Sequence, residues 1–525
     1  KDISEIIEKS VIGNDQIDRL LYRNGSSESG IAKYADIPFY AHQQRTALRN
    51  LGQINVCDVD DFIRVGGYAS VAKALTKMTP EDVIDEVTKA ELRGRGGGGF
   101  PAGRKWASAR KVKEEICYVV CNGDEGDPGA FMDRAIMEGD PHSVIEGMII
   151  ASFAVGARDA YVYVREEYPL AVVHMQKAIE QAIDLGLLGE NIMGTDFSLK
   201  MHINRGAGAF VCGESSALML SVAGNVGEPR AKYVRSVVKG LYDQPTVLNN
   251  VETYANVPEI INRGGDWFAS TGAKKNRGTK AFSLVGKIKN TGLIEIAMGT
   301  PLRTIIEDIG GGVGEGRTFK AVQTGGPSGG CLTEKHLDLP VDFDTLTQAG
   351  SMMGSGGMIV MDDKTCMVDV ARYFLAFLVK ESCGKCIPCR EGLYQLHAMA
   401  EAVCEGRGKE KDLAKMEALS DSVMVGSLCG LGKSGPNPLL STLHNFRDEY
   451  LAHIKEKRCP AGVCKELITY EVMDDKCDGC TACVPACAAK AITGAKGKVH
   501  KINLTTCTKC GACVAACTRD AILVS

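Results

Sequence analysis

The chain has 525 residues, a net charge of −4 and 45% hydrophobic residues, enough for several globular domains. It contains no apolar run long enough to span a bilayer and no basic stripe with interleaved aromatic residues, so we expect neither a membrane span nor nucleic-acid binding. Most of its 21 cysteines stand in closely spaced arrays, which favours metal or cluster binding over disulfides. We therefore expect a protein of the reducing cytosol.

The first ninety residues are predicted to be mostly helical and polar, with turns at Asn24-Gly25 and Gly66-Gly67. The chain opens at Lys1 without a methionine or a secretory signal, which leaves room for an upstream segment.

Residues 93–106 read RGRGGGGFPAGRKW and form the densest group of glycines and cations in the chain. Four consecutive glycines allow positive φ values, so successive N–H groups can turn toward an anion. The pattern predicts a cradle for a phosphorylated cofactor, although Pro101 at the expected helix start argues against a dinucleotide fingerprint. The alternative is a flexible linker, which seldom carries residues such as Phe100 and Trp106.

An alternation of strands and helices follows this loop. We predict strands at 117–121, 160–164 and 202–204 and a helix at 169–187. The first strand runs into NGDEGDPG, where polar residues collect as they do at ligand-binding strand ends; a solvated acidic turn is the alternative.

A second glycine-rich turn, NRGAGAFVCGE, leads into a predicted helix at 216–222, whose N-terminus could hold phosphate. Farther on, the adjacent amides of Asn249 and Asn250 could hydrogen-bond a polar ring edge, or could simply be turn residues.

Taken together, RGRGGGGFPAGRKW, CNGDEGDPGAF, GAGAFVCGE, PTVLNNVET and ESCGKCIPCREG resemble the flavin-bearing subunit of respiratory complex I. Among that subunit's relatives, the chain is most similar to the diaphorase subunit of soluble electron-bifurcating [FeFe]-hydrogenases. The resemblance covers about residues 30–455 and implies FMN with a nicotinamide nucleotide stacked on its ring. It places FMN against Gly94, Arg95, Gly96, Lys105, Asn122, Asp124, Gly213, Glu214, Asn249 and Asn250. It places the nicotinamide nucleotide near Gly97, Phe100, Lys105 and Lys232.

Two departures from the family pattern bear on the nucleotide. The family usually has a second glutamate where this chain has Ser215, and loss of a carboxylate near the adenosine ribose relaxes discrimination against NADP. Arg235 stands where an apolar aromatic residue is common, and arginine suits a phosphate. We therefore favour NADP(H), although the usual family member uses NAD(H). Asp127 replaces the common glutamate and Phe210 the common tyrosine.

Residues 271–360 are predicted to form a small α+β unit, with strands at 281–285 and 293–296 and a helix at 302–309. The resemblance suggests a ubiquitin-like domain of the SLBB type. No catalytic constellation is evident in this stretch, so we expect it to serve in packing and docking.

Residues 361–457 have the periodicity of a four-helix bundle. Cys383, Cys386 and Cys389 fall at one inter-helix turn and Cys429 at another, and in an antiparallel bundle those turns share an end. Three closely spaced thiolates plus a distant one favour a [4Fe–4S] cluster; zinc, which prefers paired ligands, is the alternative.

A second metal site is expected at the opposite pole of the bundle. His453, Cys459 and Cys464 are three soft ligands that require a fourth, and both Cys366 and Cys404 are predicted at that pole. We favour a structural zinc held with Cys366, as the hydrogenase resemblance also suggests. The alternative is a set of unmetallated thiols and a helix-end histidine.

The C-terminal stretch, 458–525, carries the repeated spacing Cx2Cx2Cx3C that is typical of a two-cluster ferredoxin, in which the fourth cysteine of each run serves the other cluster. One [4Fe–4S] cluster is thus assigned to Cys477, Cys480, Cys483 and Cys517. The other is assigned to Cys507, Cys510, Cys513 and Cys487. The usual proline after each run is replaced by Ala488 and Thr518, and paired zinc knuckles are the alternative.

We therefore expect a multidomain protein in which an α/β domain at 1–270 binds FMN and NADP(H) or NAD(H) and passes electrons to three [4Fe–4S] clusters. We identify no general base or nucleophile. By resemblance, the partners are a small thioredoxin-like [2Fe–2S] subunit, an [FeFe]-hydrogenase subunit, ferredoxin and, in some complexes, a formate dehydrogenase. The rival hypotheses are a non-catalytic scaffold, a non-bifurcating NADH dehydrogenase subunit and an NAD(H)-specific form of the same complex.

Overall fold

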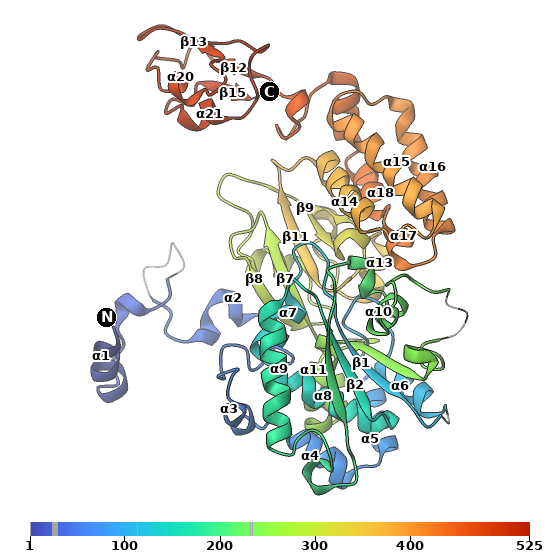
Figure 1. The fold of residues 1–525 in the computed structure, drawn as a ribbon. Helices are drawn as coiled ribbons and strands as arrows, with labels where there is room; N and C mark the ends of the chain where they lie inside the picture. The colour runs from blue at the N-terminus through green and yellow to red at the C-terminus, as the bar shows by residue number, and fades with distance from the viewer. Residues whose placement is uncertain (1, 24–29, 113, 232, 234, 525) are drawn as a thin grey trace.

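The computed structural model describes residues 2–23, 30–112, 114–231, 233 and 235–524 (Figure 1). An α/β domain is followed by a mixed sheet, a helical bundle and a small cysteine-rich module at the far end of the molecule (Figure 1). The multidomain prediction is therefore confirmed. Across the described residues, no helix combines the length and apolar character needed to cross a membrane.

The α/β domain is built on a parallel sheet with strand order β3-β2-β1-β4. Its strands are β1 (Tyr118–Gly123), β2 (Asp159–Val164), β3 (Lys200–Arg205) and β4 (Thr246–Asn250). The chain adds β2 and β3 on one side of β1 and β4 on the other, so the order reverses between β1 and β4. In open α/β sheets, ligands bind outside the carboxyl ends of strands at such a reversal.

Helices cover both faces of this sheet. Helix α8 has apolar residues on every side, so its sequence shows no amphipathic period. Almost the whole helix is buried accordingly. The helices of the domain are α3 (Val59–Arg64), α4 (Ala69–Lys77), α5 (Pro80–Lys89), α6 (Ala102–Arg110), α7 (Met132–Gly139), α8 (Pro141–Val155), α9 (Pro169–Asp184), α10 (Ser215–Val222), α11 (Val251–Arg263) and α12 (Gly265–Ala269).

Helices are the main regular structure of the N-terminal ninety residues, as predicted, but they cover only about half of that stretch. A short exposed segment, α1 (Ile3–Glu5) and η1 (Ile6–Ile12), stands apart from the body and precedes α2 (Pro38–Ala41) (Figure 1). The predicted turn at Gly66-Gly67 is present, whereas the one at Asn24-Gly25 lies outside the described residues.

The next unit is a mixed five-stranded sheet with order β10-β9-β11-β7-β8. Its strands are β7 (Thr279–Gly286), β8 (Gly292–Ala297), β9 (Phe319–Thr324), β10 (Cys331–Leu332) and β11 (Gly357–Asp362). The helical turns η7 (Thr304–Ile309) and α13 (Phe343–Gln348) supply Ile305, Ile306 and Leu346 to its core.

Four helices then pack side by side: α14 (Met367–Glu381), α15 (Ile387–Cys404), α16 (Glu410–Gly426) and α18 (Asn437–Asn445). The short α17 (Gly430–Ser434) connects the last two, and α19 (Arg447–Leu451) and η10 (Ala452–Glu456) extend the bundle. Leu375, Leu393 and Leu439 are fully buried between these helices.

The C-terminal module contains two small sheets and two short helices. Strand β12 (Tyr470–Val472) pairs with β15 (Ile522–Val524), and β13 (Ile492–Thr493) pairs with β14 (Lys501–Ile502). Helices α20 (Cys483–Ala486) and α21 (Ala512–Ala516) pack against each other. The sheet β12–β15 lies next to the chain's entry into the module, and β13 lies at the outer edge (Figure 1).

Candidate cofactor and metal sites

The polar residues that end β1 and β4 lie side by side. Parallel pairing sets Asn122 opposite Asn250, at the carboxyl ends of both strands. These ends open into a cavity of about 360 Å³. The predicted residues that line it are Gly96, Gly97, Asn122, Asp124, Asp127, Gly213, Glu214, Ser215 and Asn250, together with Phe210.

The glycine loop passes over this cavity between α5 and α6. Gly97 and Gly99 have φ values of +105° and +57°, which favour glycine. A Cβ on Gly96 would lie 2.9 Å from Cβ of Asn250, so only glycine allows this approach. Helix α6 begins directly after Pro101, but a helix rather than a strand precedes the loop. The prediction of a cradle without a Rossmann fingerprint fits this geometry.

Asp124 supplies an unusual group to the cavity. Its Oδ2 is buried and has no hydrogen-bond partner among the described residues. Burial raises the pKa of this carboxyl to about 7, against the lowering effect of Arg165. Such an orphaned oxygen fits a ligand whose polar ring edge carries donors and acceptors, as the isoalloxazine of FMN does.

Three predicted flavin contacts line neither this cavity nor its neighbour described below. The Arg95 side chain is 1% exposed and donates to the carbonyl groups of Thr279, Arg93 and Arg277. It therefore ties the loop to the neighbouring sheet, and its guanidinium is not among the groups that line the cavity. Gly94 is also outside the cavity lining. The buried Oδ1 of Asn249 has no partner among the described residues, although Asn249 does not line the cavity either.

A buried charge network lies behind Asn250. Its Nδ2 donates to Asp133 Oδ2 at 2.5 Å. Close by, Lys280 and Glu252 form an ion pair at 2.5 Å, with side chains 0% and 1% exposed. Burial, together with the carboxylates of Glu125 and Glu252, raises the pKa of Asp133 well above its usual range. The network fixes the Asn250 amide, and no sequence motif indicated it.

The mixed sheet unit also contributes to the flavin cavity. Ser355 donates to Asp127 Oδ2 at 2.6 Å, and Gly354 lies against Gly97. Residues of this unit that line the cavity are Gly325, Ser328, Met352, Gly354 and Ser355. The expectation that 271–360 serves only in packing and docking was therefore too narrow. The glycines around Ser355 were the available signal.

A larger cavity, of about 890 Å³, adjoins the first through Ser215, which lines both. Three more predicted residues line it: Phe100, Lys105 and Arg235. The Lys105 amine donates to the Leu248 carbonyl at 2.6 Å, and burial lowers its pKa to about 8. Lys232 lies outside the described residues.

The sequence motifs did not predict several further charged and polar residues that line this cavity. Arg230 and Lys239 both face Asp243, at 3.3 Å and 3.7 Å. The Ser216 hydroxyl accepts from the Arg230 amide, and the Ser216 amide donates to Glu214 at the start of α10. The cavity thus has a cationic wall next to an aromatic residue, Phe100, which suits a phosphorylated nucleotide.

A third cavity is lined by all four cysteines of the bundle site, Cys383, Cys386, Cys389 and Cys429. The Leu428 amide donates to Cys386 Sγ at 3.4 Å, as amides do to cluster thiolates. Val211, Cys429 and Leu431 line both this cavity and the flavin cavity. Groups held in the two cavities would therefore be separated by a single layer of side chains.

The module brings its eight cysteines together in two groups. Cys477, Cys480, Cys483 and Cys517 line one small cavity. Cys487, Cys507, Cys510 and Cys513 line another. Each cavity thus takes its fourth cysteine from the other run, the arrangement predicted from spacing. No disulfide involves any of the 21 cysteines, all of which are among the described residues.

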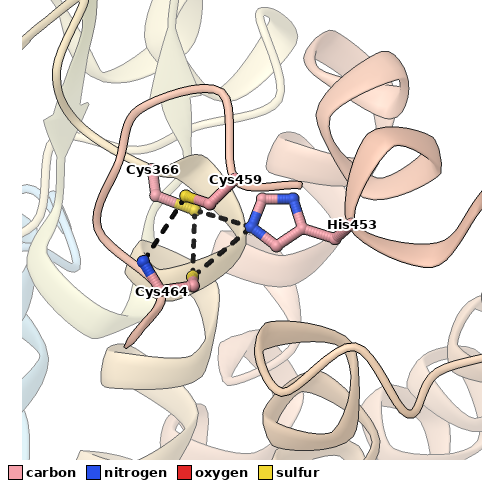
Figure 2. Close-up of side chains that lie close together, drawn as sticks. All are labelled: Cys366, His453, Cys459 and Cys464. Atoms are coloured by element: carbon pink, nitrogen blue, oxygen red, sulfur yellow. Dashed lines mark hydrogen bonds between the residues drawn. The ribbon is translucent and has the colours of Figure 1, made fainter. Parts of the chain in front are cut away.

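The last predicted site is a compact tetrad (Figure 2). Its Cys366 directly precedes α14, whereas Cys383 follows the other end of that helix. The ligand atoms of Cys366, His453, Cys459 and Cys464 lie within 4.8 Å of one another, and all four residues are buried. Cys366 Sγ is 3.7 Å from Cys464 Sγ and 3.3 Å from His453 Nε2. Tetrahedral zinc would require about 3.8 Å and about 3.5 Å, so the set fits the ion.

Details around the tetrad favour a metal over free thiols. His453 Nδ1 contacts the Glu449 carbonyl at 2.7 Å, which leaves Nε2 directed at the sulfurs (Figure 2). The Val463 amide donates to Cys459 Sγ at 3.3 Å. Cys404 is buried nearby but is not one of the four.

Comparison with known proteins agrees with this arrangement. Family models match the chain at residues 87–259 (Nuo51 FMN-binding domain), 369–453 (NADH-ubiquinone oxidoreductase-F iron-sulfur binding region) and 476–522 (4Fe-4S dicluster domain). The chain is 50% identical to NADP-reducing hydrogenase subunit HndC of Solidesulfovibrio fructosivorans, over 92% of this chain and 98% of that protein.

The chain belongs to this family of flavin- and iron–sulfur-containing NAD(P)H oxidoreductase subunits.

The chain is also similar in sequence to a subunit of NADH-quinone oxidoreductase. It is 45% identical to the F 2 subunit of NADH-quinone oxidoreductase from Rhizobium meliloti, over 75% of this chain and 94% of that protein. A crystal structure of NAD+-reducing [NiFe]-hydrogenase in the H2-reduced state aligns with a TM-score of 0.70 and 30% identity, covering 86% of this chain and 72% of that one. The family resemblance predicted from the five motifs is therefore confirmed.

Proposed function

We propose that this oxidoreductase subunit is the NADP(H)-using diaphorase of a soluble electron-bifurcating hydrogenase complex. FMN would occupy the 360 Å³ cavity and the nicotinamide nucleotide the adjoining cavity of 890 Å³. Bound flavin supplies the ability to take a hydride as a pair of electrons and release them singly. The single observation that carries the proposal is the shared wall of Val211, Cys429 and Leu431 between the flavin and cluster cavities.

The chain's own residues bind and orient rather than form covalent intermediates. The glycine loop offers backbone amides for a phosphate, and Asn122 is held by donation to the Gly213 carbonyl at 2.9 Å. Asn250 is held by Asp133. Asp124 would keep a proton near neutral pH and could act as a donor to the ring edge.

NADP(H) is favoured over NAD(H) by the groups in the larger cavity. Ser215 removes a carboxylate that would repel a 2′-phosphate, and Arg235 and Arg230 add cations to the cavity wall. A relative named as an NADP-reducing hydrogenase subunit supports the same choice. The NAD(H)-specific form and a non-bifurcating NADH dehydrogenase subunit are the competing functions.

The remaining assignments belong to the same proposal. Three [4Fe–4S] clusters would occupy the three cysteine cavities, and zinc the buried tetrad. The five-stranded unit would be the ubiquitin-like domain, with boundaries near 270, 360 and 457. The partners would be a thioredoxin-like [2Fe–2S] subunit, an [FeFe]-hydrogenase subunit, ferredoxin and, in some complexes, formate dehydrogenase. The dense cysteine arrays support a cytoplasmic location.

Anaerobic spectroscopy of the purified chain tests the core of the proposal. Flavin and iron–sulfur bands should coexist, and NADPH should bleach both faster than NADH at equal concentration. A colourless chain would leave only a scaffold role. Faster bleaching by NADH would refute the interpretation of Ser215 and Arg235 but keep the diaphorase function.

A further inference from the structure

The outer edge of the C-terminal module is strongly basic. Between Gly479 and Arg519 the sequence contains no aspartate or glutamate. Within this stretch, the hairpin at residues 490–501, which includes β13, carries four exposed lysines: Lys490, Lys496, Lys498 and Lys501. We call residues 490–501 the lysine hairpin. None of its lysines has an ion-pair partner among the described residues, so their charge is available to another molecule.

The rest of the module carries exposed charges of both signs. Its exposed carboxylates include Glu466, Glu471, Asp474, Asp475 and Asp520, and the exposed lysines Lys465 and Lys476 stand directly beside two of them in sequence. Asp478 is paired with Arg519 at 2.8 Å. The lysine hairpin is therefore the part of the module where exposed lysines stand with no carboxylate among them in sequence, and its strand β13 lies at the outer edge of the molecule (Figure 1).

The lysine hairpin is attached directly to the loops that hold the cluster cysteines. The turn of the lysine hairpin packs so closely on Gly479 that a Cβ on Gly479 would lie 2.4 Å from the backbone nitrogen of Lys498. At its other end, the Lys490 amide donates to the Cys487 carbonyl at 2.9 Å. Cys480 and Cys510, one ligand of each proposed cluster, are exposed. Charge and exposed electron-transfer sites therefore occupy the same small module.

We propose that the lysine hairpin is the docking surface for a small acidic iron–sulfur carrier protein of the ferredoxin class. This inference rests on the proposed function, because it needs clusters in the module. Clusters ligated by four thiolates are anionic, so two such proteins repel unless one supplies cations near the contact. In the encounter, one electron moves from the reduced cluster of one protein to the oxidised cluster of the other, with no bond formed or broken.

The experiment uses the full chain loaded with FMN and clusters, and a bacterial two-[4Fe–4S] ferredoxin of net negative charge as the probe. Chemically reduced ferredoxin is mixed with oxidised chain in a stopped-flow instrument, and the cluster absorbance is followed against ferredoxin concentration and salt. The test variant is K490E/K496E/K498E/K501E. The matched control, K77E/K177E/K335E/K411E, makes the same charge change with exposed lysines of the other domains.

For the test variant, we expect the half-saturating ferredoxin concentration to rise roughly tenfold or more at low salt, with the salt dependence largely lost. The control should behave as wild type, and excess reduced methyl viologen should reduce the clusters of all three proteins to the same extent. Equal ferredoxin kinetics in test variant and wild type would overturn the proposal. So would an equal loss in the control, which would show a net-charge effect without a docking surface.

Failure of the proposed function is measured separately. Bleaching of the flavin by NADPH reports on the diaphorase site, which lies in another domain from the lysine hairpin. If NADPH leaves the wild-type flavin oxidised while ferredoxin still reduces the module with the expected salt dependence, the docking surface stands and the proposed function fails.

Discussion

Replacing Cys366 by serine should release the proposed zinc, whereas replacing Cys404 should not. Cys366 is the only tetrad member that comes from before the bundle, 87 residues ahead of His453. A metal bound by both residues closes a long loop. The remaining three ligands lie within a short segment after α19, in the stretch 453–467 that joins the bundle to the module and that we call the neck. C366S therefore leaves them unable to tie the neck to the start of α14.

The size of the effect follows from that loop. The chain-entropy relation gives about 4.6 kcal/mol for a loop of this length, and cross-links in general typically contribute about 2–4 kcal/mol, which we take as the conservative range. Since about 1.4 kcal/mol is a factor of ten, local opening of the neck should become roughly 30-fold or more easier in C366S. C404S keeps the tetrad and should lie close to wild type.

Two measurements check this prediction. Inductively coupled plasma mass spectrometry should find about one zinc per chain in wild type and C404S and almost none in C366S. Hydrogen exchange of residues 453–467 should accelerate only in C366S. Full zinc content in C366S, or equal loss in both variants, would refute the tetrad. Zinc loss without faster exchange would refute the reasoning about the loop.

Three further predictions concern the cofactor sites. Ser215→Glu should restore a carboxylate next to the larger cavity and shift the NADPH-to-NADH ratio of kcat/KM at least tenfold toward NADH, with Ser215→Thr as the control. Burial raises the pKa of Asp124 to about 7, so its contribution to the stability of the FMN-free chain is present below about pH 4 and is lost as pH rises toward 7. Between those pH values the free energy of unfolding should fall with pH, and Asp124→Asn should reduce this fall by about 1.4 kcal/mol per pH unit in urea titrations. Cys517→Ala should lower iron by about four atoms per chain and abolish the cluster of Cys477, leaving the other cluster's electron paramagnetic resonance signal intact.

Much of the site could be predicted because its chemistry is carried by local motifs. Cysteine spacing alone indicated both groups in the module, and the structure brings the same residues together. The pairing of Asn122 with Asn250 needed more, because it depends on β4 joining the sheet beside β1 rather than beside β3. Strand order is decided by packing across the whole domain, which periodicity does not encode.

The features that the motifs did not predict have a common physical cause. Arg95 stands within a cationic, glycine-rich motif. Its guanidinium nevertheless donates to the carbonyl groups of Thr279, Arg93 and Arg277 and is buried. Ser355 reaches the flavin cavity only because two domains meet. Both outcomes depend on contacts between segments far apart in sequence, so a motif identifies the loop but not the direction of each side chain in it.

Burial distinguishes the proposed zinc site from the proposed cluster sites. All four members of the zinc tetrad are buried, as a closed structural site requires. Each cluster site instead has one exposed cysteine: Cys383 in the bundle, and Cys480 and Cys510 in the module. Electron transfer falls steeply with distance, so a carrier needs a cluster edge near the surface, whereas a metal that only fixes the fold does not. Under the proposed function, thiolates would therefore serve two roles that differ in exposure, and zinc in the tetrad would fix the neck from which the two clusters of the module are presented.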